Sequence, residues 1–320
     1  EMTYPVLIYS NKFGHEISLK SEEFCNLSEV DSSNIESQKD FNDRVTAATI
    51  IGTLQAGYTN FHYLRDSWKT NTENDALLGV SMTGIASMEV FKYNIEEAAL
   101  LAVEVNKDIA KQIGIKKAAR VTTVKPAGTT SLVLGTSSGI HSWHDKYYLR
   151  RMRVDKNEAI FTYLSIYAPE LLEDDLSNPE KTSIIIVPQK APENSVTREE
   201  SAIDLLKRVE NITKSWINPG FTKGYNQHNV SCTVSIRDTE WDEVKNWMWE
   251  NREIYSGISM LPHSDHTYVQ APFETCSEET YNELSKHLHS IDLSKVVEII
   301  DNTDQKGEAA CGGGSGCEIK

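Results

Sequence analysis

The residues best suited to chemistry are a carboxylate and three thiols near the two ends of this 320-residue chain. Glu16 and Cys25 lie nine positions apart in "HEISLKSEEFC", so that both could face one site. The alternative is a surface glutamate and a structural, buried cysteine. Cys311 and Cys317 lie in the last ten residues, on either side of a glycine-rich stretch.

The C-terminal tail "GEAACGGGSGCEIK" has the composition of a flexible tether, which raises the local concentration of the groups that it carries. Two thiols on a tether can exchange with a disulfide inside the folded protein and then be re-reduced at the surface. A zinc site needs about four ligands at short spacing, and the tail offers two thiols without a nearby histidine. A frayed terminus with incidental cysteines is the remaining alternative.

A second candidate site is the stretch "VKPAGTTSLVLG". Pro126 ends a predicted strand, and Gly128 frees the backbone. Thr129, Thr130 and Ser131 then present hydroxyl and N–H groups where a helix is expected to begin, which is a favourable place for an anion. The stretch does not match the GxxxxGK[ST] phosphate loop, and a simple helix cap is the alternative.

Two further stretches carry polar side chains. "HDKYYLRRMR" supplies four basic residues that could bind a phosphate or form a solvated edge: Lys146, Arg150, Arg151 and Arg153. "GISMLPHSDHTYVQAPFE" supplies His263, Asp265 and His266, which could bind a metal. We favour a turn that lines a cavity for this second stretch.

Composition narrows the class of protein. The chain is 39% hydrophobic and 25% charged, which is enough for a sizeable core. Its net charge of −15 argues against binding nucleic acid through the overall field. The sequence has neither an apolar run of about 18 residues nor a secretory signal at its start, so we expect a cytoplasmic protein. In that reducing compartment a close cysteine pair is catalytic or metal-binding more often than structural.

The elements that must position these residues follow from hydrophobic spacing. Residues 44–113 have helical periodicity, and 120–128 resemble a short strand that runs into a loop. Four consecutive apolar residues within 181–192 indicate a strand buried on both faces. Residues 197–217 form a predicted helix, with Thr197 as N-cap and Glu200 completing a capping box. A strand at 229–236 and a helix at 238–253 follow, so an α/β fold with mainly parallel strands is expected, and no clear linker divides it.

Taken in order, these stretches resemble one family: the monomeric, adenosylcobalamin-dependent (class II) ribonucleoside-triphosphate reductases, in their C-terminal part. The resemblance begins at His15 and continues to the end of the chain. Tyr147 and Tyr148 are the only adjacent tyrosines and lie in mid-chain, whereas class I reductases use a late pair, which favours the cobalamin class. The stretches that carry the resemblance are "HEISLKSEEFCNLSEV", "LLGVSMTGIA", "TTVKPAGTTSLVLGTSSGIHSWHDKYYLRRMRV", "NQHNVSCTVSI", "SGISMLPHSDHTYVQAPFE" and the tail.

The resemblance implies a role for each matching residue. Glu16 corresponds to the general base that accepts the 3′-hydroxyl proton of the ribose, and Cys25 corresponds to one of two active-site cysteines that become a disulfide. Cys311 and Cys317 correspond to the tail pair that re-reduces this disulfide. The residues that correspond to the loop holding the substrate phosphates are Pro126, Ala127, Gly128, Thr129, Thr130 and Ser131.

The resemblance also implies cofactor, partners and fold. Adenosylcobalamin generates the radical, and a thioredoxin-like protein supplies the reducing equivalents. The expected fold is the second half of a ten-stranded α/β barrel with a flexible tail. The expected divisions are an atypical segment at 1–14, the half-barrel at 15–305 and the redox tail at 306–320.

The sequence departs from the family at the thiyl position. The family has a radical-bearing cysteine two residues before the general base, and this chain has Gly14. Lys12 stands where the family has asparagine, and residues 1–14 do not resemble the family. We therefore expect the chain alone to reduce no nucleotide and to need an N-terminal half, from a split gene or from sequence lost by truncation or frame-shift. A degenerate, non-catalytic nucleotide-binding module is the alternative, although such a module has no use for the retained redox residues.

Overall fold

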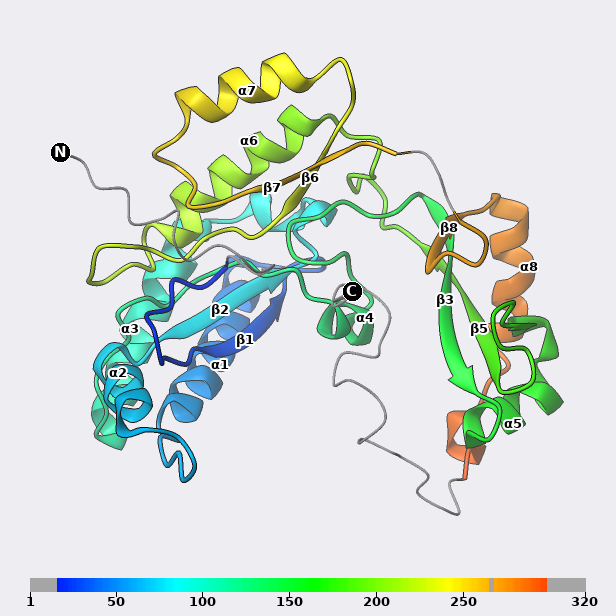
Figure 1. Ribbon diagram of the computed structural model, residues 1–320, viewed down its shortest axis with the longest axis horizontal. Coiled ribbons are helices and arrows are strands. Elements are labelled where there is room, and N and C mark those ends of the chain that lie inside the picture. The colour runs from blue at the N-terminus through cyan, green and yellow to red at the C-terminus, as the bar shows by residue number, and fades with distance from the viewer. Residues whose placement is uncertain (1–15, 265–267, 298–320) are drawn as a thin grey trace. The chain divides into compact units, whose positions relative to one another are not determined.

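The computed structural model describes residues 16–264 and 268–297. The chain divides into two compact units (Figure 1). Unit 1 comprises the residues up to Ser142 together with Asn194–Ser264, and unit 2 comprises Trp143–Glu193 together with the residues from Asp265 onward. Unit 2 is thus formed by an insertion into unit 1 and by the C-terminal part of the chain.

Unit 1 is built on parallel strands. β1 (Asn26–Asp31) pairs with β2 (Leu78–Thr83), and β6 (Thr233–Ile236) pairs with β7 (Ser259–Pro262) (Figure 1). The segment 120–125 connects the two pairs, because Thr122 forms a parallel bridge with Val80 and Val124 forms one with Val230. Five extended segments therefore run side by side in the order β1, β2, 120–125, 229–236 and β7.

Helices pack on these strands and bury a large apolar core. α1 and α3 pack against each other, and α1 also packs against β1 and β2. Phe41 on α1 stacks on Trp216, and both side chains are fully buried. The helices of unit 1 are α1 (Gln38–Ala56), α2 (Asp66–Asp75), α3 (Ile95–Ile113), α4 (Thr129–Leu134), α6 (Ala202–Ile212), which continues into a π-helical turn at Thr213–Ile217, and α7 (Trp241–Glu250), with short 3-10 turns at Ile85–Ser87 and Glu89–Lys92.

Local signals explain several helix ends. The hydroxyl of Ser37 accepts the Asp40 N–H at the start of α1, and the side chain of Asn94 accepts the Glu97 N–H at the start of α3. Gly114 ends α3 in the left-handed conformation. The predicted cap at Thr197 is wrong: α6 begins after Ser201, whose hydroxyl accepts the Asp204 N–H at 3.1 Å.

The predicted helical character of 44–113 is also wrong at its centre. Residues 78–83 form β2, and all six residues are buried. A strand that is covered on both faces lacks the alternation of apolar and polar residues, so its sequence resembles a buried helical segment.

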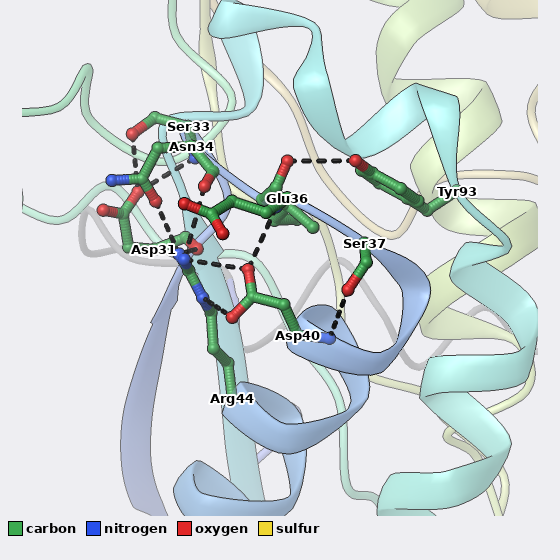
Figure 2. A network of polar contacts seen from close by, with 9 residues as sticks. Asp31, Ser33, Asn34, Glu36, Ser37, Asp40, Arg44 and Tyr93 are labelled. Carbon is green, nitrogen blue, oxygen red and sulfur yellow. Dashed lines mark hydrogen bonds and ion pairs between the residues drawn. The ribbon is translucent and has the colours of Figure 1, made fainter.

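A polar network closes the loop between β1 and α1 (Figure 2). Arg44 donates to the carbonyl oxygen of Asp31 at 2.9 Å and to Oδ1 of Asn34 at 2.6 Å. It also pairs with Asp40, one turn earlier on α1, at 2.9 Å. The carboxylate of Asp31 accepts hydrogen bonds from the N–H and hydroxyl of Ser33. These contacts fix the carboxyl end of β1 to the first turns of α1.

Unit 2 is an antiparallel sheet with helices. The strand order is β4-β5-β3-β8. The prediction of mainly parallel strands therefore holds for unit 1 and is wrong for unit 2. The elements are β3 (Tyr147–Asp155), α5 (Ala159–Tyr167), a 3-10 turn at Pro169–Leu171, β4 (Leu172–Asp174), β5 (Thr182–Lys190), β8 (Phe273–Thr275), α8 (Glu278–Leu288) and a 3-10 turn at Leu293–Lys295.

The strand predicted at 181–192 is present as β5, but its two faces differ. Ile184 and Ile186 are buried, whereas Ile185 and Val187 are partly exposed. A strand of an antiparallel sheet can leave one face half-covered, so the expectation of burial on both faces is wrong here. Within the two described ranges, none of the helices combines the length and the apolar character needed to cross a lipid bilayer.

Candidate active site

Glu16 is anchored by its backbone to the central extended segments of unit 1. Its carbonyl oxygen accepts the hydroxyl proton of Thr123 at 2.7 Å and the backbone N–H of Asn229 at 3.0 Å. Its side-chain Oε2 is buried without a hydrogen-bond partner among the described residues. A carboxylate oxygen held in this way remains available to accept a proton from a bound molecule.

The residues that follow Glu16 are held by a buried histidine. The Ser18 N–H donates to Nδ1 of His228 at 3.2 Å, and Nε2 of His228 contacts the Leu78 carbonyl oxygen at 2.8 Å. Burial lowers the pKa of His228 to about 3, so the ring is neutral and donates from Nε2. The neutral ring thereby ties the Glu16 segment to β2.

Cys25 lies immediately before β1, and the residue as a whole is partly exposed although its sulfur is largely buried. Burial of the sulfur and then the charge of Glu23 raise the pKa of Cys25, and the charge of Glu16 raises it further. The charge of Glu16 therefore reaches the Cys25 sulfur, although it contributes less to the shift than burial and Glu23 do. The thiol is kept protonated, in a form that can give up hydrogen rather than act as a ready thiolate nucleophile.

A pocket of about 300 Å³ adjoins Cys25. Its other lining residues are Phe24, Asn26, Gln55, Ala56, Tyr58, Phe61 and Thr72. Phe24 contacts the rings of Phe61 and Trp68 with centroid distances of 5.0 and 4.7 Å. The cysteine thus lies at the edge of an aromatic cluster, which explains the loss of solvation at its sulfur.

Two buried carboxylates near these residues were not recognised in the sequence. Glu23 accepts the Lys20 N–H at 2.7 Å through Oε2, while its Oε1 has no partner in the described part of the chain. Burial raises the pKa of Glu23. Glu29 lies in the middle of β1, opposite Ser81 of β2. Nothing in the stretch "NLSEVD" distinguishes Glu29 from a solvated glutamate, so no local signal could have revealed its burial.

The loop predicted to bind phosphate leads into a helix, as expected. α4 begins at Thr129, directly after Gly128. Thr129 is exposed, but Ser131 is buried and its hydroxyl donates to the Ala127 carbonyl oxygen. The structure therefore leaves Thr129 and the backbone as groups available to a ligand and uses the Ser131 hydroxyl internally.

Gly139 lies against the backbone of Lys125, the residue that directly precedes this loop. Gly139 has φ of +54°, and a Cβ at this position would collide with the carbonyl oxygen of Lys125. The segment 135–139 also contacts β2, since Thr83 Oγ1 donates to the Ser137 carbonyl oxygen at 2.9 Å and accepts the Gly139 N–H at 3.0 Å. Only glycine combines this conformation with this close approach.

Two of the predicted basic residues form ion pairs within unit 2. Arg151 pairs with Glu173 and Glu274 across the sheet of unit 2, and Arg153 pairs with the buried Asp175. These arginines have structural partners in unit 2. Gly14, Asp265, His266, Cys311 and Cys317 lie outside the described residues. Across the described ranges, no three His, Cys, Asp or Glu side chains are grouped so as to hold a metal ion.

No protein-family model matches the chain. Curated proteins named adenosylcobalamin-dependent ribonucleoside-triphosphate reductase do. That of Levilactobacillus brevis is 24% identical over 324 aligned residues, covering 91% of this chain and 42% of the relative. The protein of Euglena gracilis is 25% identical, and the alignment covers 92% of this chain and 40% of the relative. A protein of Dictyostelium discoideum, named a probable reductase of this type, is 28% identical, and the alignment covers 88% of this chain and 37% of the relative.

A solved structure shows the same fold. The crystal structure of a B12-dependent (class II) ribonucleotide reductase superimposes with a TM-score of 0.73 at 21% identity, covering 88% of this chain and 42% of that chain. The chain thus spans less than half the length of the relatives that it matches. Most of this chain is therefore similar in sequence to adenosylcobalamin-dependent ribonucleoside-triphosphate reductases and shares its fold with part of a class II ribonucleotide reductase.

Proposed function

We propose that this chain is the C-terminal portion of an adenosylcobalamin-dependent ribonucleoside-triphosphate reductase, which converts ribonucleoside triphosphates to 2′-deoxyribonucleotides. The observation that carries the proposal is the similarity to three curated reductases of this type over 88–92% of the chain, together with the fold shared with a class II enzyme. A protein that only bound nucleotides would have no use for the cysteines Cys25, Cys311 and Cys317.

The proposal includes the second half of a ten-stranded barrel. Five extended segments of unit 1 lie side by side in parallel order, as half of such a barrel requires. β1 and β7 are the outer segments of this array, and an unpaired strand edge favours the addition of another strand. The remaining five strands would come from an N-terminal half, on a separate chain or in sequence that precedes this one.

The described residues have defined roles in this reaction. Glu16 accepts the proton of the 3′-hydroxyl, and the C2′–OH bond breaks so that its oxygen leaves as water. Two thiols, one of them Cys25, supply two hydrogens and two electrons: one hydrogen completes the leaving water, the other is placed on C2′, and the two thiols become a disulfide. The protonated state of Cys25 suits this role, because the thiol must deliver hydrogen.

Cys311 and Cys317 would then reduce the disulfide by exchange and be reduced in turn by a thioredoxin-like protein. Adenosylcobalamin, when bound to the whole reductase, would supply the initiating radical. The pocket beside Cys25, about 300 Å³, does not fit this cofactor, since such a volume is at the lower limit even for drug-sized ligands. We therefore assign no described residue to hold the cofactor.

Disulfide trapping tests the role of Cys25. In the full chain with Cys317→Ser, mild oxidation should join Cys25 to Cys311, because the tail thiol has lost its neighbour. Mass spectrometry after proteolysis identifies the linked peptides. Cys232→Ser is the matched control, since Cys232 is another cysteine of unit 1 and is 4% exposed. Absence of a Cys25–Cys311 link, with the tail thiol joined at random or not at all, would support a non-catalytic nucleotide-binding module instead.

The departure at Gly14 gives a second test. We expect the purified chain, supplied with adenosylcobalamin and a dithiol, to form no deoxynucleotide. Formation of deoxynucleotide would refute the expectation that a separate half must supply the radical-bearing cysteine. Restoration of activity by a chain that carries the N-terminal half would support it.

A further inference from the structure

Glu29 connects β1 to the start of the loop predicted to bind phosphate. Its Oε1 accepts the hydroxyl proton of Ser81 at 3.1 Å, and Ser81 Oγ accepts the backbone N–H of Lys125 at 3.1 Å. Glu29 and Ser81 are direct partners in the register of β1 and β2. The carboxyl group thus acts on the backbone of Lys125 through a single intervening hydroxyl.

The second carboxyl oxygen of Glu29 faces the same lysine. Oε2 lies 3.9 Å from Nζ of Lys125 and has no hydrogen-bond partner among the described residues. The Glu29 side chain is 5% exposed, whereas that of Lys125 is 25% exposed. Lys125 therefore extends from the buried carboxyl group toward solvent and directly precedes Pro126.

Few other charges face Glu29. β2 and α4 carry no charged side chain. Besides Lys125, the segment 120–125 has one other charged side chain, Arg120, which pairs with Asp75 at 3.6 Å. Residues 16–19 add Glu16, whose carbonyl oxygen binds Thr123.

α1 packs on the opposite face of β1, because a Cβ on Gly52 would lie 3.6 Å from Ser28 Oγ. Its charged residues near this end, among them Arg44, Asp40 and Lys39, are engaged with one another or with the β1–α1 loop. Among the described residues, Lys125 is therefore the charged group that acts on Glu29.

We propose that Glu29 is a positioning residue for the segment Lys125–Ser131 and that it takes up a proton when an anion binds there. This inference rests on the proposed function, because in such a reductase Pro126–Ser131 would correspond to the loop that holds the substrate phosphates. Ionised Glu29 attracts the Lys125 ammonium group and strengthens the Ser81 hydrogen bond. A bound triphosphate attracts the same ammonium group and repels the carboxylate, so binding favours neutral Glu29.

Because Glu29 is buried, its pKa lies within the physiological pH range, and the proton uptake occurs in that range. Burial raises the pKa of Glu29 to about 7, although the Lys125 charge and the Ser81 hydrogen bond lower it. A nearby anion raises the pKa of Glu29 further. Affinity for the anion should therefore fall as pH rises above 7, beyond any change that the anion's own titration causes.

Nuclear magnetic resonance on the full chain tests the connection without a ligand. In the wild-type chain, the Glu29 carboxyl carbon and the Lys125 amide should titrate together, with a midpoint near pH 7. Glu29→Gln should abolish the titration of the Lys125 amide. Ser81→Ala should preserve the Glu29 titration and remove most of the Lys125 response. Glu243→Gln, an exposed acidic position on α7, is the control and should change neither. A Lys125 titration that persists in Glu29→Gln overturns the positioning role.

Calorimetry with inorganic triphosphate tests the proton uptake. Between pH 6 and pH 8, wild-type affinity should fall about fivefold relative to Glu29→Gln if anion binding raises the pKa of Glu29 by about one unit from about 7. The ratio of the two dissociation constants cancels the titration of the triphosphate itself. Equal pH profiles for the two chains overturn the proton exchange. If neither chain binds triphosphate while the Lys125 titration depends on Glu29, the phosphate-binding role in the proposed function fails and the anion-linked exchange fails with it, although the positioning role stands.

Discussion

The indole N–H of Trp216 donates to the carbonyl oxygen of Thr123 at 3.0 Å. Trp216 is fully buried, and the Thr123 hydroxyl donates in turn to the carbonyl oxygen of Glu16. A residue at the end of the α6 region thus holds the strand on which the candidate general base rests. Residues of three distant parts of the sequence therefore meet at Thr123, Trp216 through the Thr123 carbonyl oxygen and Glu16 through the Thr123 hydroxyl.

Trp216→Phe should destabilise the chain by about 1–3 kcal/mol, since the ring is largely retained but the Thr123 carbonyl group loses its buried partner. Denaturant unfolding followed by circular dichroism measures the change. Trp249→Phe is the control, because the Trp249 side chain is 71% exposed, and it should change the free energy of unfolding by less than about 0.5 kcal/mol. Equal effects of the two substitutions would contradict the structural role of the indole N–H.

Gly139→Ala should be more harmful than Gly135→Ala. Both glycines have positive φ, +54° and +68°, so alanine adds backbone strain at each, about 1–2 kcal/mol. A Cβ on Gly135 meets nothing within 4 Å, whereas a Cβ on Gly139 meets the Lys125 backbone. We expect a further loss of about 1–3 kcal/mol for Gly139→Ala, measured by thermal unfolding. If the two variants unfold alike, Gly139 is not held tightly against Lys125.

Glu23→Gln should make Cys25 more reactive. The Glu23 charge raises the pKa of Cys25, so its removal lowers this pKa and increases the thiolate fraction at a given pH. Alkylation of Cys25 by iodoacetamide at pH 8.5, followed by mass spectrometry, should accelerate about threefold or more. Cys232 serves as the internal reference, because burial raises its pKa to about 12 and neither Glu23 nor Glu16 contributes to that shift. An unchanged Cys25 rate would contradict the electrostatic coupling.

His228 should make the chain sensitive to acid. The pKa of His228 is lowered by burial from 6.5 to about 3, so between these values the unfolded chain binds a proton that the folded chain does not. The free energy of unfolding should therefore fall with decreasing pH, by up to about 1.4 kcal/mol per pH unit from this residue. His228→Gln should reduce this slope, whereas His289→Gln, at an exposed position, should not. Urea unfolding at pH 5, 6 and 7 provides the comparison, and identical slopes for wild type and His228→Gln would refute the prediction.

The sequence predicted the parts of the fold that leave local patterns. α3 and α7 follow from apolar spacing, and β5 and β6 follow from short apolar runs. β2 was missed because a strand buried on both faces has no alternation, and the antiparallel sheet of unit 2 was missed because strand direction is set by pairing between distant segments. Spacing and the family resemblance, which followed from motif order, singled out Glu16 and Cys25, and the roles of these two residues stay predictions. Glu23 and Glu29 were missed because nothing local distinguishes a buried carboxylate from a solvated one.

The contacts that anchor Glu16 also determine at what stage of synthesis its position becomes fixed. Its backbone partners are Thr123 and Asn229, which lie 107 and 213 residues farther along the chain. Contacts of such long sequence separation form late and slow folding. When β1 and α1 have emerged from the ribosome, Asn229, which completes the anchor of Glu16, has therefore not yet emerged. The candidate general base becomes fixed only after Asn229 emerges, so a nascent chain that stalls before this point carries the site's residues without the site.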